Sequence, residues 1–264
     1  METKTILIAF LLTLVAGLST GIGSLISLIA KRTNTNFLSF SLGLSAGVMI
    51  YVSFMEMLPQ SLQQFTNEYG GKLGMLYMIL GLFGGIIIIA FIDFMIPKSS
   101  NPHEMHAVEE MRHKSELRYT GIITAITIAI HNFPEGIATF MSALTSLEIA
   151  IPITIAIAIH NIPEGIAVAV PIYHSTGSKK KAFWLSFASG LAEPIGAVIA
   201  FFFLIPFWNA TLNAFVLSAI AGIMIFISLD ELLPTAEKFG KHHHAISGLV
   251  LGMLIMAISL YMFV

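Results

Sequence analysis

Cysteine is absent from this 264-residue chain, and charged residues are scarce. The lack of cysteine excludes disulfides, thiolate nucleophiles and cysteine-based metal centres, so a metal site would need His, carboxylate, amide or Met ligands. Only 11% of the residues are charged, against about 25% in an average soluble domain. A soluble protein of this size could not cover its surface with so few charges. The net charge of −2 offers no basic surface for nucleic acid.

Long apolar runs take the place of the missing charges, and 56% of the residues are hydrophobic. A membrane-spanning helix needs about 20 mostly apolar residues. The first run follows Lys4 but is longer than the roughly 7–15 apolar residues of a signal peptide, so we interpret it as a span. We therefore expect an all-α membrane protein with one polytopic domain, residues 1–264. The eight predicted spans are residues 6–29, 37–58, 73–96, 120–144, 149–173, 183–205, 212–233 and 246–264.

Basic residues are distributed unequally between the loops at the two ends of these spans. The loops after spans 1, 3, 5 and 7 hold 11 of the 13 Lys and Arg residues, and only Lys4 and Lys72 fall on the other side. The positive-inside rule therefore predicts that both termini lie outside the cytoplasm, in a cell (inner) membrane. The longest linker, about residues 97–119, is then cytoplasmic, and no separate soluble domain fits in it.

Carboxylates and histidines remain inside the spans without basic partners. Ionisable groups at membrane depth are costly, which makes them functional candidates. Because no Lys or Arg lies deep in any span, the carboxylates need protons or bound cations to offset their repulsion. This asymmetry favours a cation pathway, whereas protonated carboxyls that join helices by hydrogen bonds are the structural alternative. The residues concerned are Glu56, His131, Glu135, His160, Glu164, Glu193, Asp230 and Glu231.

A six-residue motif occurs once in span 4 and once in span 5. The first motif is His-Asn-Phe-Pro-Glu-Gly at residues 131–136, and the second is His-Asn-Ile-Pro-Glu-Gly at residues 160–165. His and Glu four residues apart lie on one face of a helix. The proline between them lacks an N–H group and frees the carbonyl four residues earlier, which opens the helix where the polar side chains gather.

The two motifs are expected at matching depths. The turn between spans 4 and 5 is centred near Leu147, with His131 16 residues before it and Glu164 17 residues after it. Glu135 lies 12 residues before this turn and His160 lies 13 after it. An antiparallel hairpin then sets His131 beside Glu164 and Glu135 beside His160, roughly 18–25 Å from the turn and near mid-membrane. Imidazole with carboxylate suits zinc and other borderline divalent ions. The predicted ligands are His131, Asn132, Glu135, His160, Asn161 and Glu164.

Further polar residues lie close to this centre in sequence or on the loops. Glu193 follows Gly-Leu-Ala in span 6 and is a candidate carboxylate ligand, with a hydrogen bond at a helix kink as the alternative. The loop histidines could bind metal weakly after passage, or they could simply be solvated polar residues. They are His103, His106, His113, His242, His243 and His244.

Spans 2 and 7 carry sequences that align without gaps, residues 46–59 (AGVMIYVSFMEMLP) with residues 221–234 (AGIMIFISLDELLP). Span 7 is the fifth span after span 2, an odd number, so the two copies cross the membrane in opposite directions. Inverted repeats of this kind are typical of transporters. We therefore expect spans 1–3 to mirror spans 6–8 around a central hairpin of spans 4 and 5. Glu56 and Glu231 would approach the centre from opposite faces and, with Asp230, are candidates to guide ions.

The chain resembles the ZIP family of metal transporters, and within it the bacterial ZupT type, in both His motifs, the Gly-Leu-Ala-Glu segment and the aligned ends of spans 2 and 7. The resemblance implies movement of zinc, iron, manganese, cobalt or cadmium into the cytoplasm through a binuclear site on spans 4, 5 and 6. Pro194 departs from the family pattern. The resemblance assigns one ion to His131, Glu135, His160 and Glu164, and a second ion to Asn132, Glu135, Asn161, Glu164 and Glu193.

An intramembrane zinc-dependent hydrolase is the main alternative, since His and carboxylate ligands also hold catalytic zinc. The motif is not His-Glu-x-x-His and no nucleophile is marked, so we prefer a transporter without enzymatic activity, whose metal is the substrate and not a cofactor. A passive cation channel would use the same residues. The expected partners are divalent metal ions and the lipid bilayer, with a homodimer as one candidate assembly and no nucleic acid.

Overall fold

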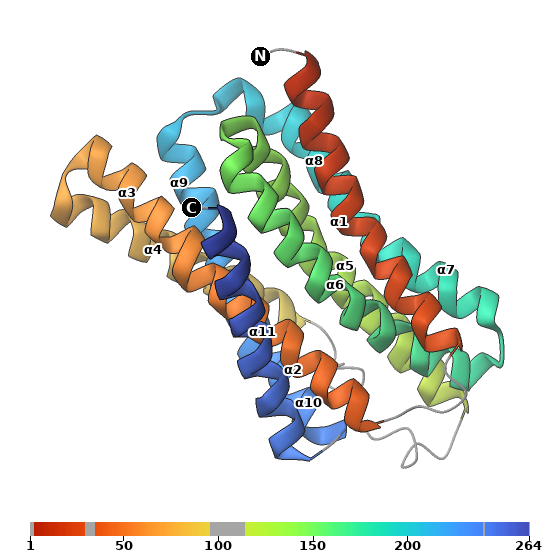
Figure 1. The fold of residues 1–264 in the computed structure, drawn as a ribbon. Coiled ribbons are helices and arrows are strands. Elements are labelled where there is room, and N and C mark those ends of the chain that lie inside the picture. Colours follow the sequence, from red (N-terminus) through yellow and green to blue (C-terminus); the bar gives the residue numbers. More distant parts are fainter. Residues whose placement is uncertain (1–2, 30–34, 96–113, 240, 264) are drawn as a thin grey trace.

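The computed structural model describes residues 3–29, 35–95, 114–239 and 241–263, which are almost entirely helical. The long helices run up and down past one another as a bundle (Figure 1). The loop residues His103, His106 and His113 lie outside the described residues. In chain order the helices are α1 (Thr3–Ile29), α2 (Thr35–Val52), η1 (Ser53–Met57), α3 (Leu58–Tyr69), α4 (Gly71–Met95), α5 (Lys114–Thr145), α6 (Leu147–Thr176), α7 (Lys179–Gly190), α8 (Ala192–Ile199), η4 (Ala200–Leu204), η5 (Ile205–Phe207), α9 (Ala210–Ile227), η6 (Ser228–Leu232), α10 (Leu233–Phe239) and α11 (His242–Phe263).

Eight helical segments coincide with the eight expected spans. Within the described residues, seven segments are long and apolar enough to cross a membrane, and α5, with 32 residues, is the remaining one. Large apolar side chains cover their outer faces; on α4, for example, Phe83, Ile87 and Phe94 are 55%, 66% and 80% exposed. Such a surface suits lipid and not water. The prediction of an all-α, multi-pass membrane protein is therefore confirmed.

The predicted end of span 2 at residue 58 is wrong, because the helix continues through η1 and α3 to Tyr69. The α3 segment is too polar to be recognised as part of a span, yet it buries Leu58, Ser61 and Phe65 on one side. Phe65 packs edge-on against Phe215 of α9, with ring centroids 4.7 Å apart. Amphipathic burial therefore extends this helix beyond its apolar part. Similarly, α5 begins at Lys114, six residues before the predicted start at 120.

The α5–α6 hairpin forms the centre of the bundle (Figure 1). Its turn is a single residue, Ser146, whose side chain caps α6 by accepting a hydrogen bond from the Glu148 backbone N–H at 3.2 Å. So short a connection forces the two helices to run antiparallel, and the turn lies where the sequence predicts it. The α5 helix continues through Pro134 without interruption.

The aligned segments of spans 2 and 7 share a local distortion. Each contains a π-helical turn at the same place, η1 and η6. In each turn a serine hydroxyl donates to the carbonyl four residues earlier, Ser53 to Met49 and Ser228 to Met224, both at 2.7 Å. Single π turns are rare and often occur at functional sites. Their occurrence at equivalent positions supports the inverted repeat.

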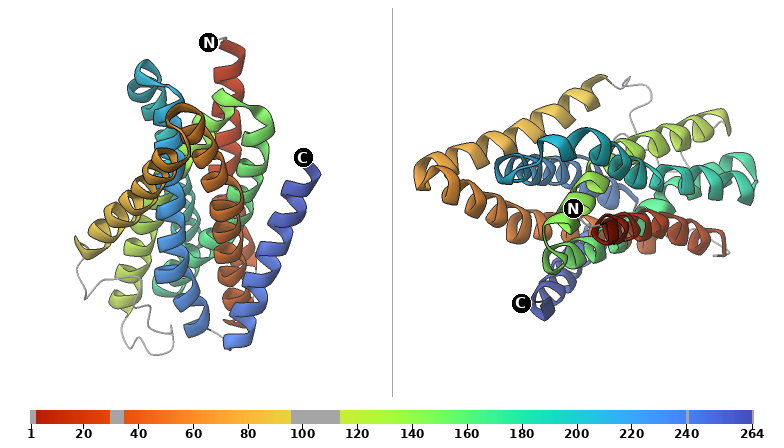
Figure 2. Two further views of the ribbon diagram at one scale, coloured as in Figure 1. Left: turned by 90° about the vertical axis from the view of Figure 1, so that its left-hand side faces the viewer. Right: turned by 90° about the horizontal axis from the view of Figure 1, so that it is seen from above.

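Helix packing in the two halves is also mirrored. The α2 helix packs on α11 and the α9 helix packs on α4, so the second span of each repeat contacts the last span of the other. A Cβ atom at Gly47 would collide with the backbone of Leu249 on α11, and one at the aligned Gly222 would collide with the backbone of Leu82 on α4. Small residues permit this close approach of helices in a membrane. Both chain ends lie in the upper half of the bundle in the left view of Figure 2, as an even number of spans requires.

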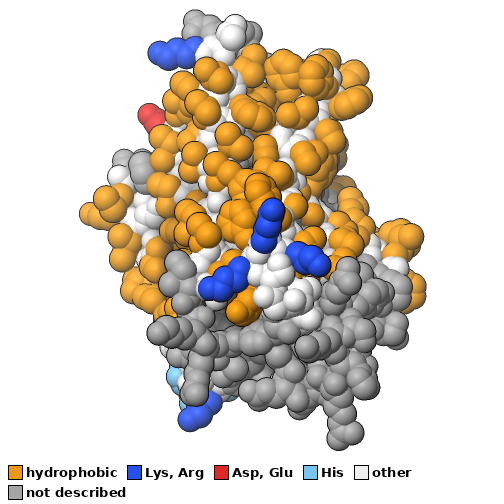
Figure 3. All heavy atoms as spheres, turned by 90° about the vertical axis from the view of Figure 1, so that its right-hand side faces the viewer, with side chains coloured by type: hydrophobic (Ala, Val, Ile, Leu, Met, Phe, Trp, Pro, Cys, Tyr) orange, Lys and Arg blue, Asp and Glu red, His pale blue; other side chains and the backbone are white. Residues whose placement is uncertain are grey.

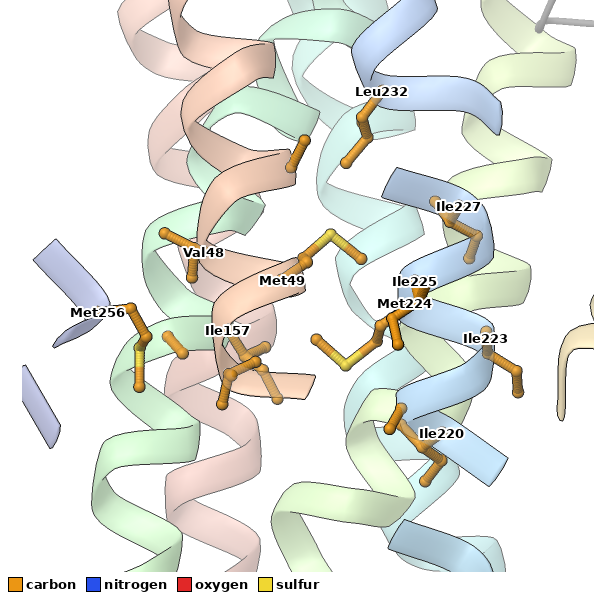
Figure 4. Packing of buried hydrophobic residues seen from close by; sticks show 14 of the residues in the cluster. Val48, Met49, Ile157, Ile220, Ile223, Met224, Ile225, Ile227, Leu232 and Met256 are labelled. Atoms are coloured by element: carbon orange, nitrogen blue, oxygen red, sulfur yellow. The ribbon is translucent and has the colours of Figure 1, made fainter. Parts of the chain in front are cut away.

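The largest apolar core lies between α2, α6 and α9. Met49 of α2 and Met224 of α9, which are equivalent in the two repeats, both lie in this core, with Ile157 of α6 close by (Figure 4). This core joins the two repeats to the central hairpin that carries the His motifs.

Candidate metal-binding site

The first and second motifs exchange partners across the hairpin. His131 Nε2 of α5 lies 3.2 Å from Glu164 Oε1 of α6, and His160 Nε2 of α6 lies 3.1 Å from Glu135 Oε2 of α5. All four side chains are at most 1% exposed. The pairing that the sequence predicts from depth alone is therefore confirmed.

The two motif asparagines extend these pairs toward neighbouring helices. Asn161 Nδ2 donates to the Ala16 carbonyl of α1 at 3.0 Å and also to Glu193 Oε1 of α8. With its amide oriented to satisfy both of its polar atoms, Asn132 donates to the Ile128 carbonyl at 3.1 Å and to Glu164 Oε2 at 3.3 Å. The structure thus brings all seven residues predicted as ligands into one connected region.

The glycine that ends each motif allows the flanking helices to approach. A Cβ atom at Gly136 would collide with the backbone of Glu193 on α8, and one at Gly165 would collide with the backbone of Thr20 on α1. The first motif therefore packs on α8 and the second on α1. For this reason Glu193 lies beside the hairpin although it is remote from both motifs in sequence.

Three carboxylates and two imidazoles are buried here, at Glu135, Glu164, Glu193, His131 and His160, whereas no Lys or Arg whose side chain the structure describes is buried. Buried charges of one sign require compensation, which protons or a bound cation can supply.

Several polar atoms at this centre have no hydrogen-bond partner within the described residues, although buried polar groups are normally paired. The lone pairs of such nitrogen and oxygen atoms suit a metal ion of borderline character. The atoms are His131 Nδ1, His160 Nδ1, Glu135 Oε1, Asn161 Oδ1 and Glu193 Oε2.

The His–Glu pairs limit how metal can bind in this conformation. Across the described ranges, three or more His, Asp or Glu side chains do not surround one point closely enough to hold an ion. Each imidazole instead contacts a carboxylate. Ligation by three or more of these groups therefore requires the two His–Glu pairs to shift toward a common ion.

The three pathway candidates differ in their placement. Glu231 on η6 is only 3% exposed and interacts electrostatically with His131. The adjacent Asp230 is exposed, and Glu56 on η1 is half-buried and accepts a hydrogen bond from Gln60 Nε2. The structure therefore connects Glu231 to the central site. Sequence reasoning missed Gln60, although its spacing of four residues from Glu56 was the available signal.

The second motif also contacts α2. Ser45 Oγ of α2 donates to the His160 carbonyl at 3.3 Å, a contact for which the sequence carried no signal.

The loop histidines that the structure describes lie apart from the motifs. At the corner between α10 and α11, His242 Nδ1 lies 2.7 Å from Glu237 Oε1, and both side chains are exposed. The His242 and His243 rings are 5.7 Å apart. These loop groups stay separate from the central site.

Comparisons with known proteins match the chain along its length. The model of a family described as ZIP zinc transporter matches residues 3–110 and 97–260. A zinc transporter ZupT from Streptococcus mutans is 59% identical over 257 residues, which is 97% of this chain and 97% of that protein. Proteins of the same name from Clostridium perfringens and Corynebacterium aurimucosum are 54% and 52% identical, and cover 99% and 100% of this chain and 98% and 100% of their own lengths.

Proposed function

The chain belongs to the ZIP family, and we propose that it transports zinc ions across a membrane through the centre formed by the two His motifs and Glu193. The family is one of transporters, so an intramembrane hydrolase is no longer the competing interpretation. One observation carries the proposal: the exchanged His131–Glu164 and His160–Glu135 pairs are buried midway along the central hairpin, and no Lys or Arg side chain that the structure describes is paired with them.

The chemistry of this centre suits binding and release of a dehydrated cation. A zinc ion that enters the centre loses water and gains imidazole nitrogen and carboxylate oxygen ligands in exchange. Each of the paired side chains would supply one lone pair to the ion. Because these ligands bind metal only when deprotonated, entry of zinc displaces protons.

We further propose that two ions can share this centre. His131, Glu135, His160 and Glu164 would hold the first ion. Asn161 and Glu193, already joined by a hydrogen bond, would hold the second ion together with Asn132, and the carboxylates of Glu135 and Glu164 would bridge the two. Glu231, which interacts with His131 from η6, would receive or deliver the ion on one side.

The remaining properties follow from the sequence pattern and belong to the same proposal. Residues 1–264 act as one transport domain, with both termini outside the cytoplasm and with metal moving inward. Iron, manganese, cobalt and cadmium would share the zinc pathway, because imidazole and carboxylate bind all of these ions. A homodimer in the lipid bilayer is the proposed assembly. A passive channel would use the same residues, and it would show no saturation of flux.

Zinc uptake into proteoliposomes tests the proposal. The parent protein is compared with Glu135→Ala and Glu164→Ala at matched protein content. Glu148→Ala is the control, because Glu148 is an exposed glutamate in the first turn of α6, outside the proposed centre. We expect saturable uptake in the parent and in the control, and its collapse in both motif variants. Uptake by both motif variants at the parent rate would overturn the site assignment. Failure of the parent to move any divalent metal would overturn the function.

A further inference from the structure

An open cavity of about 470 Å³ lies at the beginning of α7, and none of its lining residues belongs to either His motif. It is lined by Ser178, Lys180, Lys181, Trp184 and Leu185. Its size is within the range of about 300–1,000 Å³ that is common for small-molecule sites. Figure 3 faces the side of the molecule on which α1 and α7 lie, and shows basic side chains gathered at the lower end of a broad hydrophobic surface.

The lysines that line the cavity are available to bind an anion. Lys180 and Lys181 are exposed, and neither forms an ion pair within the part of the chain that the structure describes. The Ser178 side chain accepts a hydrogen bond from the Lys181 backbone N–H at 3.3 Å, so its own O–H is free to donate outward. Two lysine side chains and one serine side chain therefore line this cavity, and the lining that the structure describes includes no carboxylate.

The other wall of the cavity is apolar and aromatic. Trp184 is 54% exposed and packs edge-on against Phe183 and Phe187, with ring centroids 5.5 Å and 5.6 Å apart. Tryptophan favours the level of lipid headgroups, where one end of its ring is wet and the other is apolar. The side chains that line the cavity thus change from lysine to aromatic and aliphatic within two turns of α7. This combination suits an amphiphilic ligand better than a free ion.

We propose that this cavity binds the headgroup of an anionic phospholipid. Lys180, Lys181 and the Ser178 hydroxyl hold the phosphate, and the Trp184 ring and Leu185 contact the start of the acyl chains. Basic cavities at the membrane surface are known to recognise lipids through this combination of contacts. The inference does not depend on zinc transport, because none of these residues belongs to the metal centre.

Fluorescence quenching by brominated lipids tests this site. The chain has two tryptophans, so Trp208→Phe leaves Trp184 as the only tryptophan. This variant is reconstituted in mixed phosphatidylglycerol and phosphatidylcholine vesicles in which one lipid or the other carries brominated acyl chains. We expect brominated phosphatidylglycerol to quench Trp184 more strongly than brominated phosphatidylcholine at equal mole fraction. The preference should fall about fivefold for each of Lys180→Gln and Lys181→Gln.

Lys179→Gln is the matched control, because it removes the same charge from the same turn of α7 without altering the cavity lining. It should retain the preference for phosphatidylglycerol. Equal quenching by both lipids would overturn the proposal, and so would an equal loss in Lys179→Gln, which would indicate diffuse surface attraction. Inorganic phosphate is compared with chloride at equal ionic strength. If both lipids quench Trp184 equally and inorganic phosphate alone changes its emission, the cavity is a site for a soluble anion and the lipid assignment fails.

Discussion

His160 Nε2 of α6 lies 3.1 Å from Glu135 Oε2 of α5, so the glutamate of the first motif is paired with the histidine of the second. The reciprocal contact joins His131 to Glu164. Each motif is therefore incomplete alone, and the hairpin as a whole forms the functional unit. Movement of one helix relative to the other would change both pairs together.

A double-mutant cycle on zinc uptake should reveal this exchange of partners. Glu135→Ala and His160→Ala remove two groups that act together, so the double variant should lose less transition-state stabilisation than the sum of the single losses. The expected coupling is about 0.5–3 kcal/mol, the range for residues in contact. It is measured from kcat/KM of zinc uptake in proteoliposomes. A control cycle combines Glu135→Ala with Thr154→Ala and should show additive losses. Thr154 is a buried residue of α6 that donates to the Ala150 carbonyl.

The motif glycines should be sensitive to the smallest added side chain. Gly136→Ala and Gly165→Ala place a methyl group against the backbone of α8 and α1, respectively. Because backbone cannot rotate away, we expect a destabilisation of about 1–3 kcal/mol, the usual cost of overpacking. Thermal unfolding of the purified protein in detergent measures it. Gly84→Ala on α4 is the control, since a Cβ atom there meets nothing within 4 Å. Equal stability of all three variants would contradict the described packing.

The sequence predicted which motif residues lie level with one another, because few physical quantities determine this pairing. The rise of about 1.5 Å per residue and the position of one turn fix which residues of an antiparallel hairpin lie level. The contacts His131–Glu164 and Glu135–His160 follow directly from that geometry. The inverted repeat was recognisable for a similar reason, since residues 46–59 and 221–234 align without gaps.

Contacts between helices that are distant in sequence could not be predicted in this way. The hydrogen bond from Asn161 to Glu193 depends on how closely α8 approaches Gly136, and no local pattern encodes that approach. The continuation of the second span into α3 was missed because its polar composition conceals a buried face that includes Phe65. The π turns were missed because their hydrogen bonding depends on backbone geometry that residue type alone does not specify.

Adjacent acidic residues on η6 should behave differently. Glu231 is buried and interacts with His131, whereas Asp230 is exposed. We therefore expect Glu231→Gln to reduce zinc uptake about tenfold or more, since loss of a charge-assisted contact in a buried site costs about 1.5–3 kcal/mol. Asp230→Asn should reduce uptake less than Glu231→Gln does, because the Asp230 side chain is exposed. Radioactive zinc uptake at matched expression compares the two. A larger effect in Asp230→Asn would mean that the assignment of the pathway role to Glu231 is wrong.

Protons should compete with zinc at the paired motifs. His131, His160 and the two motif glutamates bind metal only in their deprotonated forms, so acidification lowers the fraction of transporters that can accept an ion. The KM for zinc should therefore rise as pH falls across about 8 to 5, the range in which histidine commonly titrates. The rise should approach about tenfold per pH unit for each proton that zinc displaces. Uptake is measured with the same pH inside and outside the vesicles, because a pH gradient would add a driving force to the competition. Glu148→Ala should follow the parent curve, since Glu148 lies outside the centre. A KM that is constant over this range would mean that zinc enters without displacing protons, and the His–Glu pairs could not then be its ligands.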